Sequence, residues 1–300
     1  MIRIALAAAA ALALWAAPGL AQQQQDFSKV QIKTTDLGHN TYMLEGAGGN
    51  TTVAVAADGV IIVDGEFAPM HDKIKAAIAA LTSAPIRYLV NTHYHGDHTG
   101  GNVPFAADGV IVVAHVNVKK RLADGSVNGK AEKGQPAPAG ALPARTYTSA
   151  MVLTLKGRTA SLHHVANAHT DGDTYVWFKD ANVIATGDTV NMGRYPNIDY
   201  MNGGNIKGMI AATDIYLKLA NDQTKFVPGH GPLSDKAAVA QYRAMLVAAR
   251  DRMAKLVKAG KTEDEVQAAK PFADYDAKLG VTPQQSSNFI RVVYHSLKDK

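Results

Sequence analysis

The sequence predicts an α+β protein in which two β-sheets pack together and helices cover them from outside. Two observations lead to this prediction. Segments rich in β-branched residues are followed by segments of helical periodicity, and this succession occurs in two similar halves of the chain. Residues of the kind that bind metals stand directly after predicted strands, where the sites of α/β proteins commonly lie. Two halves that each consist of strands followed by helices are typical of two packed sheets with helices outside.

The N-terminus predicts a secretory signal peptide over residues 1–21. Arg3 precedes the apolar run Ile4–Ala17, and Gly19-Leu20-Ala21 offers small residues at the positions that a signal peptidase reads. The run is shorter than the roughly 20 residues that a membrane-spanning helix needs. We therefore expect a periplasmic or secreted protein that has no membrane association once the signal is cleaved. The Gln-rich residues 22–29 are expected to form a disordered leader, and residues 30–300 a single domain.

The amino-acid composition limits which binding partners and which kind of metal site we expect. The chain has no cysteine, so we expect no disulfide, and a metal site would have to be built from histidine and carboxylate. The formal net charge is +5. Because the basic residues are spread along the chain rather than clustered, we expect no nucleic-acid partner. A small-molecule substrate is expected, and no obligate protein partner is evident.

The first half begins with predicted strands and ends at a cluster of histidines. Asp58-Gly59 lies between two β-branched runs and favours a hairpin turn. Ile74, Ile78 and Leu81 recur at helical spacing. The predicted elements are strands at Val30–Lys33, Thr41–Leu44, Thr51–Ala56 and Val60–Val63, a helix at Met70–Leu81 and a strand at Ile86–Asn91.

The second half repeats this kind of succession. The segment Ala123–Arg145, rich in Gly, Ala, Pro and Lys, predicts a mobile loop rather than a linker between domains. The predicted strands are Val110–Ala114, Met151–Leu155, Ala160–Val165, Thr174–Phe178, Val183–Thr186 and Lys225–Val227. The predicted helices are Val116–Leu122, Ile206–Leu219, Lys236–Ala259, Val266–Ala269 and Ser286–Leu297.

One short stretch after the strand at 86–91 holds three imidazoles and a carboxylate, namely His93, His95, Asp97 and His98. Side chains alternate along an extended segment, so His93 and His95 should point the same way and could share a metal. Asp97 and His98 follow a bend that Gly96 permits. Imidazole and carboxylate suit zinc and its first-row neighbours. The cluster therefore predicts a metal site, with two metals as the first interpretation.

Three more ligand-type residues, His169, Asp188 and His230, each stand just beyond a predicted strand. Each is flanked by Gly or by other residues that permit sharp backbone turns. Together with the first cluster they make seven ligands. Seven suffice for two metals with a shared carboxylate and open positions for water.

These motifs make the sequence similar to the metallo-β-lactamase superfamily, whose signature is His-x-His-x-Asp-His followed by a distant His, an Asp and a final His. The resemblance covers nearly the whole chain from about Val30 to the helix after His230. It implies an αβ/βα four-layer sandwich and two Zn²⁺ ions, with Fe or Mn as alternatives. It also implies that the first metal is held by His93, His95 and His169, the second by Asp97, His98 and His230, and that Asp188 bridges the two.

The resemblance implies a hydrolase in which a metal-bridging hydroxide, oriented by Asp97 as the catalytic residue, opens a cyclic amide or ester. β-Lactams are candidate substrates, which would give a role in antibiotic breakdown. The best known acquired β-lactamases, however, have Cys or Ser where Asp188 stands, and this chain looks closest to exported β-lactamase-like hydrolases that keep the Asp. A glyoxalase-type thioesterase, a lactonase, a di-iron redox member and a non-catalytic metal-binding member stay open as alternatives.

Other residues have expected supporting roles. Asp64 and Asp171, at strand ends near ligands, are candidates to hydrogen-bond the ligand imidazoles or to stabilise turns. The candidate substrate contacts are Phe67, Tyr94, Arg194 and Tyr195, of which Arg194 could pair with a substrate carboxylate or lie on the surface. The candidate walls of the site are residues 123–145 and 193–204. Capping, core or surface roles are expected for His39, His71, His115, His163, His164 and His295.

Overall fold

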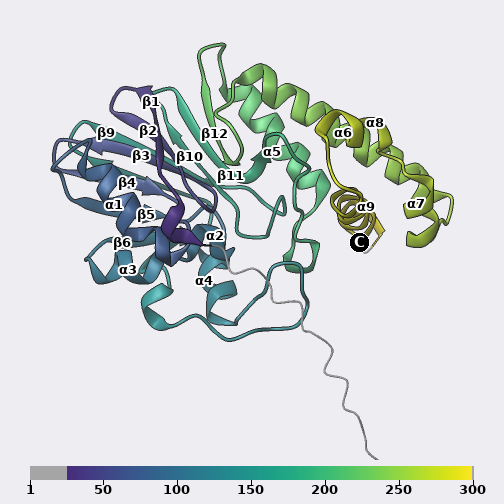
Figure 1. Ribbon diagram of the computed structural model, residues 1–300, viewed down its shortest axis with the longest axis horizontal. Coiled ribbons are helices and arrows are strands. Elements are labelled where there is room, and N and C mark those ends of the chain that lie inside the picture. Colours follow the sequence, from purple (N-terminus) through teal and green to yellow (C-terminus); the bar gives the residue numbers. More distant parts are fainter. Residues whose placement is uncertain (1–25, 299–300) are drawn as a thin grey trace, which may run out of the picture.

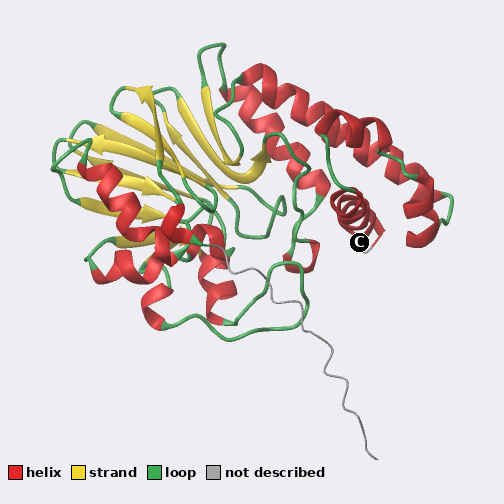
Figure 2. Cartoon of the chain, viewed as in Figure 1, coloured by secondary structure: helices red, strands yellow, loops and turns green. Residues whose placement is uncertain are grey.

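A computed structural model describes residues 26–298 of the chain, so the predicted signal peptide lies outside the described residues. Two β-sheets form the centre of the molecule, and helices cover their outer faces (Figures 1 and 2). Of the expected leader, residues 26–29 are described, and Phe27–Lys29 form a 3-10 turn that Asp26 caps. Within residues 26–298 no helix is long and apolar enough to cross a membrane.

The first sheet has seven strands in the order of the sequence. Four strands form an antiparallel meander, and the following three join it in parallel. Parallel strands need a crossover connection, and helices supply it here. The strands are β1 (Lys33–Gly38), β2 (Thr41–Glu45), β3 (Asn50–Ala56), β4 (Gly59–Val63), β5 (Ile86–Val90), β6 (Ile111–His115) and β7 (Arg145–Tyr147).

The second sheet has five strands in the order β12-β11-β10-β9-β8. Its strands pair antiparallel except at β11 and β12, which run parallel because α5 connects them. The strands are β8 (Ala150–Leu155), β9 (Arg158–His164), β10 (Thr174–Phe178), β11 (Val183–Asn191) and β12 (Lys225–His230).

Apolar side chains along a strand point alternately into the core between the two sheets and into the core beneath the helices. Ile61 and Val63 of β4 join the core between the two sheets, whereas Val60 and Ile62 join the core beneath the helices. Successive strand residues face opposite sides of a sheet, so a strand that is apolar throughout serves both layers. This is why β4 is buried along its whole length.

The helices lie outside the sheets and complete four layers, which confirms the predicted αβ/βα sandwich (Figure 2). Helices α1 (His71–Ala79) and α3 (Asn102–Ala107) pack on the first sheet, and α4 (Val116–Ala123) follows β6. The second sheet is covered by α5 (Ile206–Leu219) and α6 (Lys236–Lys258). Three further helices, α7 (Glu263–Ala269), α8 (Ala273–Leu279) and α9 (Pro283–Lys298), pack against this layer.

Some element boundaries differ from the predicted ones. The first strand is β1 at Lys33–Gly38 rather than Val30–Lys33, because Val30 and Ile32 pack on the outer core while Leu37 enters the core between the sheets. The segment expected to be only a loop contains a 3-10 turn at Ala139–Ala141 and ends in β7, which pairs with β6. Strand β11 runs on past Thr186, since its pairing with β12 continues to Asn191 through two irregularities.

Candidate metal centre

The seven predicted ligands meet in one place, at the ends of strands from both sheets. Their ligand atoms form three groups, each with all its atoms within 4.8 Å of one another. The groups are His93, His95 and His169; Asp97, His98 and His230; and His93, His98 and Asp188. The third group joins the other two, so the arrangement has the form of two adjoining half-sites with a carboxylate between them.

Local backbone structure presents the first four ligands. The chain leaves β5 at Val90, and a helical turn, α2 (Gly96–Thr99), follows with His95 as its N-cap residue. Asp97 and His98 therefore project from a helical turn rather than from the expected glycine bend. A Cβ at Gly96 would meet no other atom within 4 Å, so the site does not require glycine there.

The three ligands from the second sheet lie on one connection and on two neighbouring strands. His169 lies between β9 and β10, Asp188 lies within β11, and His230 ends β12. Gly229 lets β12 pass close to Asp188, because a Cβ at Gly229 would lie 1.9 Å from Asp188 Oδ1. The parallel pairing of β11 and β12 thus brings Asp188 beside His230.

The distances place Asp188 between the half-sites. Its Oδ1 lies 3.3 Å from His98 Nε2, and its Oδ2 lies 3.4 Å from His230 Nε2 and 3.7 Å from His169 Nε2. In the second half-site, Asp97 Oδ2 lies 3.1 Å from His230 Nε2. Each carboxylate therefore faces imidazoles at a spacing that leaves room for a cation between them.

Three atoms at the centre of the site lack the partner that a buried polar atom needs. His93 Nε2, His98 Nε2 and Asp188 Oδ1 are buried and have no hydrogen-bond partner among residues 26–298. An unsatisfied buried polar atom costs about 1–3 kcal/mol. Metal ions bound by these atoms would remove that cost, and a donor set of imidazole and carboxylate suits zinc, iron or manganese. The residues present therefore fit a pair of such ions.

The ring nitrogens that face away from the centre have partners, which orients the rings. His98 Nδ1 lies 2.9 Å from Asp64 Oδ2, and His93 Nδ1 lies 3.0 Å from Thr92 Oγ1. Such outer partners select the tautomer of a metal-binding histidine and hold its ring. Asp64 thus occupies the position expected of it.

Two of the outer partners come from one loop, the Gly193–Gly204 loop. His169 Nδ1 donates to Asn197 O at 2.6 Å, and His95 Nε2 donates to Asp199 Oδ2 at 3.0 Å. The interpretation of Asp171 as such a partner is wrong, because its carboxylate is paired with Arg121 instead. Asp199, fully buried, was missed by sequence reasoning.

The glycine pair Gly203-Gly204 is a sequence signal for the loop that carries Asp199. A Cβ at Gly204 would lie 2.3 Å from His169 O and 2.9 Å from Asp199 N. Adjacent glycines of this kind indicate that another backbone passes closely. Here the closest backbone is that of His169, one of the candidate ligands.

The surroundings of the histidines shift their pKa values in two opposite directions. Burial, together with the neighbouring imidazoles, holds the pKa of His93 well below its usual range and lowers the pKa of His169 to about 4. For His230, burial lowers the pKa, but Asp188 and Asp97 outweigh burial and raise it to about 9. His93 and His169 are thus neutral at pH 7, whereas Asp97 and His230 pair opposite charges.

Of the expected substrate contacts, Tyr94 and Tyr195 have their hydroxyls engaged in hydrogen bonds within the protein. Tyr94 is buried, and its hydroxyl donates to Asp199 Oδ2 at 2.5 Å. Tyr195 is buried, its ring lies parallel to that of Phe289, and its hydroxyl donates to Asp276 Oδ1 at 2.7 Å. Tyr94 is thus enclosed by the protein, whereas Tyr195 lines the cavity that Arg194 also borders.

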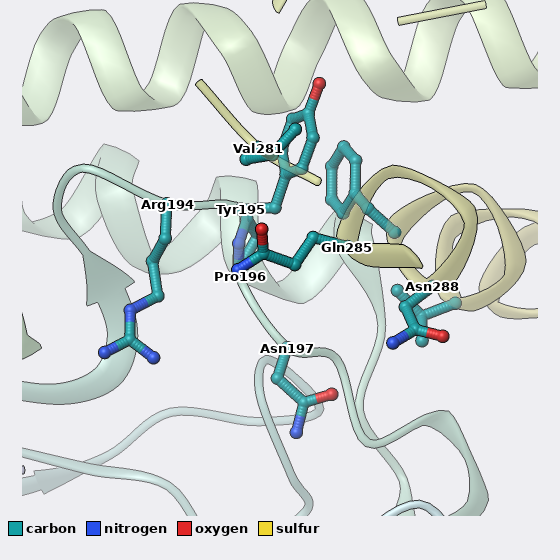
Figure 3. Close-up of a pocket in the computed structure, with 9 residues that line it drawn as sticks. Arg194, Tyr195, Pro196, Asn197, Val281, Gln285 and Asn288 are labelled. Atoms are coloured by element: carbon teal, nitrogen blue, oxygen red, sulfur yellow. The ribbon is translucent and has the colours of Figure 1, made fainter. Parts of the chain in front are cut away.

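The other two expected contacts remain candidates. Phe67 packs edge-on against Phe27, beside the glycine-rich turn next to Asp97. Arg194 is exposed and has no ion-pair partner in the described part of the chain. It borders a cavity of about 310 Å³ between the Gly193–Gly204 loop and α9, and Figure 3 shows Gln285 and Asn288 of α9 on the opposite side.

The remaining histidines have the structural roles expected of them. His115 accepts a hydrogen bond at the start of α4 and stacks on His164, and His163 stacks on Tyr175. His71 lies against Phe105. None of these belongs to a group of three candidate ligands within residues 26–298.

Comparison with known proteins gives one family. A family model described as the Metallo-beta-lactamase superfamily matches residues 44–251. The chain is 28% identical over 152 residues to the 2,4-dinitroanisole O-demethylase subunit alpha of Nocardioides sp. (strain JS1661). It is 26% identical over 210 residues to the Beta-lactamase-like protein 2 homolog of Caenorhabditis elegans. These matches cover 49% and 68% of this chain but only 43% and 62% of the two relatives.

Solved structures share the fold at low sequence identity. The metallo-beta-lactamase from Pontibacter korlensis is 18% identical with a TM-score of 0.60, and the match covers 72% of this chain and 99% of that one. The DIM-1 metallo-beta-lactamase is 16% identical with a TM-score of 0.61, over 74% and 100% of the two chains. The similarity concerns the arrangement of sheets and helices.

Proposed function

The chain belongs to the metallo-β-lactamase superfamily, and from this we propose that it is a hydrolase that uses two zinc ions to open a cyclic amide or ester. The observation that carries the proposal is the convergence of seven ligand-type side chains around three buried, unpartnered ligand atoms. In this proposal His93, His95 and His169 would hold the first ion, and Asp97, His98 and His230 would hold the second. Asp188, between the two groups, would contribute its carboxylate to the pair.

The ions, when bound, supply a Lewis acid for the substrate carbonyl and lower the pKa of water toward neutrality. The protein residues position these groups and move the protons. Asp97 is suited to accept the proton of the attacking water and to pass it on, because its side chain is 27% exposed against 8% for Asp188. Asp188, nearly enclosed, has the role of fixing the spacing of the two half-sites.

The proposed substrate class rests on an exposed arginine in the loop that supports His95 and His169. Arg194 can pair with a carboxylate on the substrate, which many small cyclic amides carry. β-Lactams are therefore the first substrates to assay, and their hydrolysis would give the protein a role in antibiotic breakdown. One of the two relatives carries β-lactamase-like in its name, which supports the choice.

An ester or thioester substrate is the second candidate. The observation that favours it is the carboxylate of Asp188 at the position where the resemblance places Cys or Ser in the best known acquired β-lactamases. A lactone or a thioester would use the same nucleophile and the same ligands. The substrate panel must therefore contain both bond types.

The experiment combines metal analysis with that panel. Purified protein should contain about two zinc ions per chain and should hydrolyse nitrocefin, a lactone or a thioester. His95→Ala and Asp188→Ala should lose bound metal and activity together. Retained hydrolysis in metal-stripped protein would refute the proposal. Visible absorbance of the purified protein would favour the di-iron alternative, and two bound zinc ions without any hydrolysis would favour a non-catalytic metal-binding protein.

We also propose that the protein acts outside the cytoplasm, on a small molecule and without an obligate partner protein. The proposal rests on the apolar N-terminal sequence with its small residues before Gln22. N-terminal sequencing of the protein recovered from cell fractions tests it. A mature chain beginning near Gln22 in the periplasm or the medium is expected, and full-length protein in the cytoplasm would contradict it.

A further inference from the structure

The Gly193–Gly204 loop supports two of the three histidines of the first half-site. Asn197 O accepts the Nδ1–H of His169 at 2.6 Å, and Asp199 N–H donates to His169 O at 2.9 Å. Asp199 also accepts the Nε2–H of His95 at 3.0 Å. The position of this loop thus determines the direction in which His95 and His169 present their other ring nitrogens.

The loop is in turn attached to the C-terminal helices. The ring of Tyr195 lies 4.1 Å from the ring of Phe289 of α9 at an interplanar angle of 10°. The Tyr195 hydroxyl donates to Asp276 Oδ1 of α8 at 2.7 Å. Just after the loop, Asn205 Nδ2 donates to Ser296 O of α9 at 2.5 Å. Helices far along the sequence therefore anchor both ends of the loop.

Contacts between the loop and α9 are interrupted by a cavity. Its volume is about 310 Å³, and Arg194, Pro196 and Asn197 line it on the loop side (Figure 3). Tyr195 and Phe289 line this cavity as well, and Tyr200 of the loop stacks on His295 of α9. Two ring pairs and the Tyr195 hydroxyl thus hold the loop against α8 and α9.

The second half-site has a different support. His98 is held by Asp64, which follows β4 in the first sheet. The family match ends at residue 251, so α7, α8 and α9 lie beyond the matched residues. His95 and His169 of the first half-site are thus held by the loop that α8 and α9 contact. His98 of the second half-site is held by Asp64, which also bonds to Thr92 beside His93.

We propose that α8 and α9 position the first metal half-site, and that Tyr195 is the positioning residue that transmits their position to His95 and His169. This inference rests on the proposed function, because it concerns affinity for the metal ions. It adds that loss of the Tyr195 contacts lowers the affinity of the protein for only one of the two ions. Outer partners of ligand histidines typically change metal affinity by about 10- to 100-fold.

The test compares Tyr195→Phe and Tyr195→Leu with the wild-type full-length protein. Phenylalanine keeps the stacked ring and loses the hydroxyl, whereas leucine loses both. Competition between the protein and a chelator for Zn²⁺ gives two dissociation constants for each variant. We expect one constant to rise about 10-fold in Tyr195→Leu and less in Tyr195→Phe, while the other constant stays unchanged.

A spectroscopic measurement identifies the half-site. In protein loaded with Co²⁺, the ring N–H protons of ligand histidines give separately shifted NMR signals. The Nε2–H of His95 and the Nδ1–H of His169 should exchange faster with solvent in Tyr195→Leu. The Nδ1–H of His98, which donates to Asp64, serves as the internal reference and should not change.

The matched control is Tyr294→Phe. It removes a tyrosine hydroxyl from α9 that bonds to Lys261 O rather than to an element of the site. An equal loss of zinc affinity in Tyr294→Phe and Tyr195→Phe would overturn the inference, because it would show a general loss of stability. Two unchanged dissociation constants in Tyr195→Leu would overturn it as well and leave the proposed function intact. Wild-type protein that binds no zinc would refute both.

Discussion

At the scale of single residues, Asp64 combines an unusual backbone with a buried carboxylate. Its φ is 64°, in the left-handed region that Asp and Asn tolerate better than most residues. Its carboxylate accepts hydrogen bonds from Thr92 N and Thr92 Oγ1 and faces His98 Nδ1. Such a conformation is retained where the surroundings over-determine it, which is common at functional sites.

Asp64→Asn is expected to lower the affinity of the second half-site for its metal ion by about 10- to 100-fold. The left-handed backbone is still tolerated, but the amide group turns N–H donors toward Thr92 or His98, where acceptors are needed. Zinc affinity measured by chelator competition gives the result. Asp171→Asn is the matched control, since Asp171 pairs with Arg121 and touches no ligand imidazole. An equal effect in both variants would contradict the role of Asp64.

Gly229 shows the opposite case, a residue whose missing side chain is the essential feature. A Cβ at this position would lie 1.9 Å from Asp188 Oδ1 and 2.7 Å from Gly187 C. The Asp188 carboxylate or the backbone of β11 would have to shift to admit it.

Gly229→Ala should therefore displace Asp188 and abolish the binding of at least one zinc ion, while the fold is retained. Metal content together with circular dichroism measures both effects. Gly140→Ala is the control, because a Cβ at Gly140 would meet nothing within 4 Å. Normal metal content in Gly229→Ala would show that Asp188 is not needed between the half-sites.

At the scale of elements, His115 joins β6 to the start of α4. Its Nδ1 accepts a hydrogen bond from Asn117 N–H, and its Nε2 donates to Thr148 O at 2.8 Å. The bond from Asn117 requires an unprotonated Nδ1, whereas Nε2–H can donate to Thr148 O in either protonation state. Burial and the stacked His164 lower the pKa of His115, and the bond to Thr148 O and the charge of Asp171 oppose them without reversing the shift.

This arrangement predicts a loss of stability in acid. The unfolded chain binds a proton at His115 near pH 6.5, whereas the folded chain binds it only at a lower pH. The contribution of His115 is thus complete above pH 6.5 and is lost as the pH falls through the lower pKa of the folded state. Urea unfolding of metal-free protein at pH 7.5 and 5.5 measures it.

His115→Asn is the comparison, because asparagine can cap α4 and does not titrate. The wild-type protein should lose more unfolding free energy between the two pH values than the variant does. The other titratable groups are the same in both proteins, so the difference between them reports on His115 and its contacts. Equal losses would contradict the prediction.

At the scale of the whole molecule, the site joins the two sheets. The ligands come from loops and strands of both, so bound ions would cross-link the two halves of the sandwich. An ion that binds only the folded chain stabilises it by about 2.7 kcal/mol per site at a free concentration 100-fold above its dissociation constant.

Zinc should therefore raise the midpoint of thermal unfolding of the wild-type protein, and chelator should reverse the rise. Differential scanning calorimetry at several zinc concentrations gives the dependence. Asp188→Ala lacks the carboxylate between the half-sites and should show a much smaller rise. An equal rise in both proteins would place the stabilising zinc outside this site.

The sequence alone determined the layers and the seven ligands. Strand periodicity decides which side chains face a core, and ligand chemistry depends on residue type and local spacing, as at His93, His95 and Asp97. The tertiary structure decided what surrounds the ligands. Asp199 supports His95 from more than a hundred positions away along the chain, and Tyr195 reaches Asp276 and Phe289 in helices at the C-terminus. Such contacts arise only when distant segments pack, and packing leaves no periodic signal in the chain.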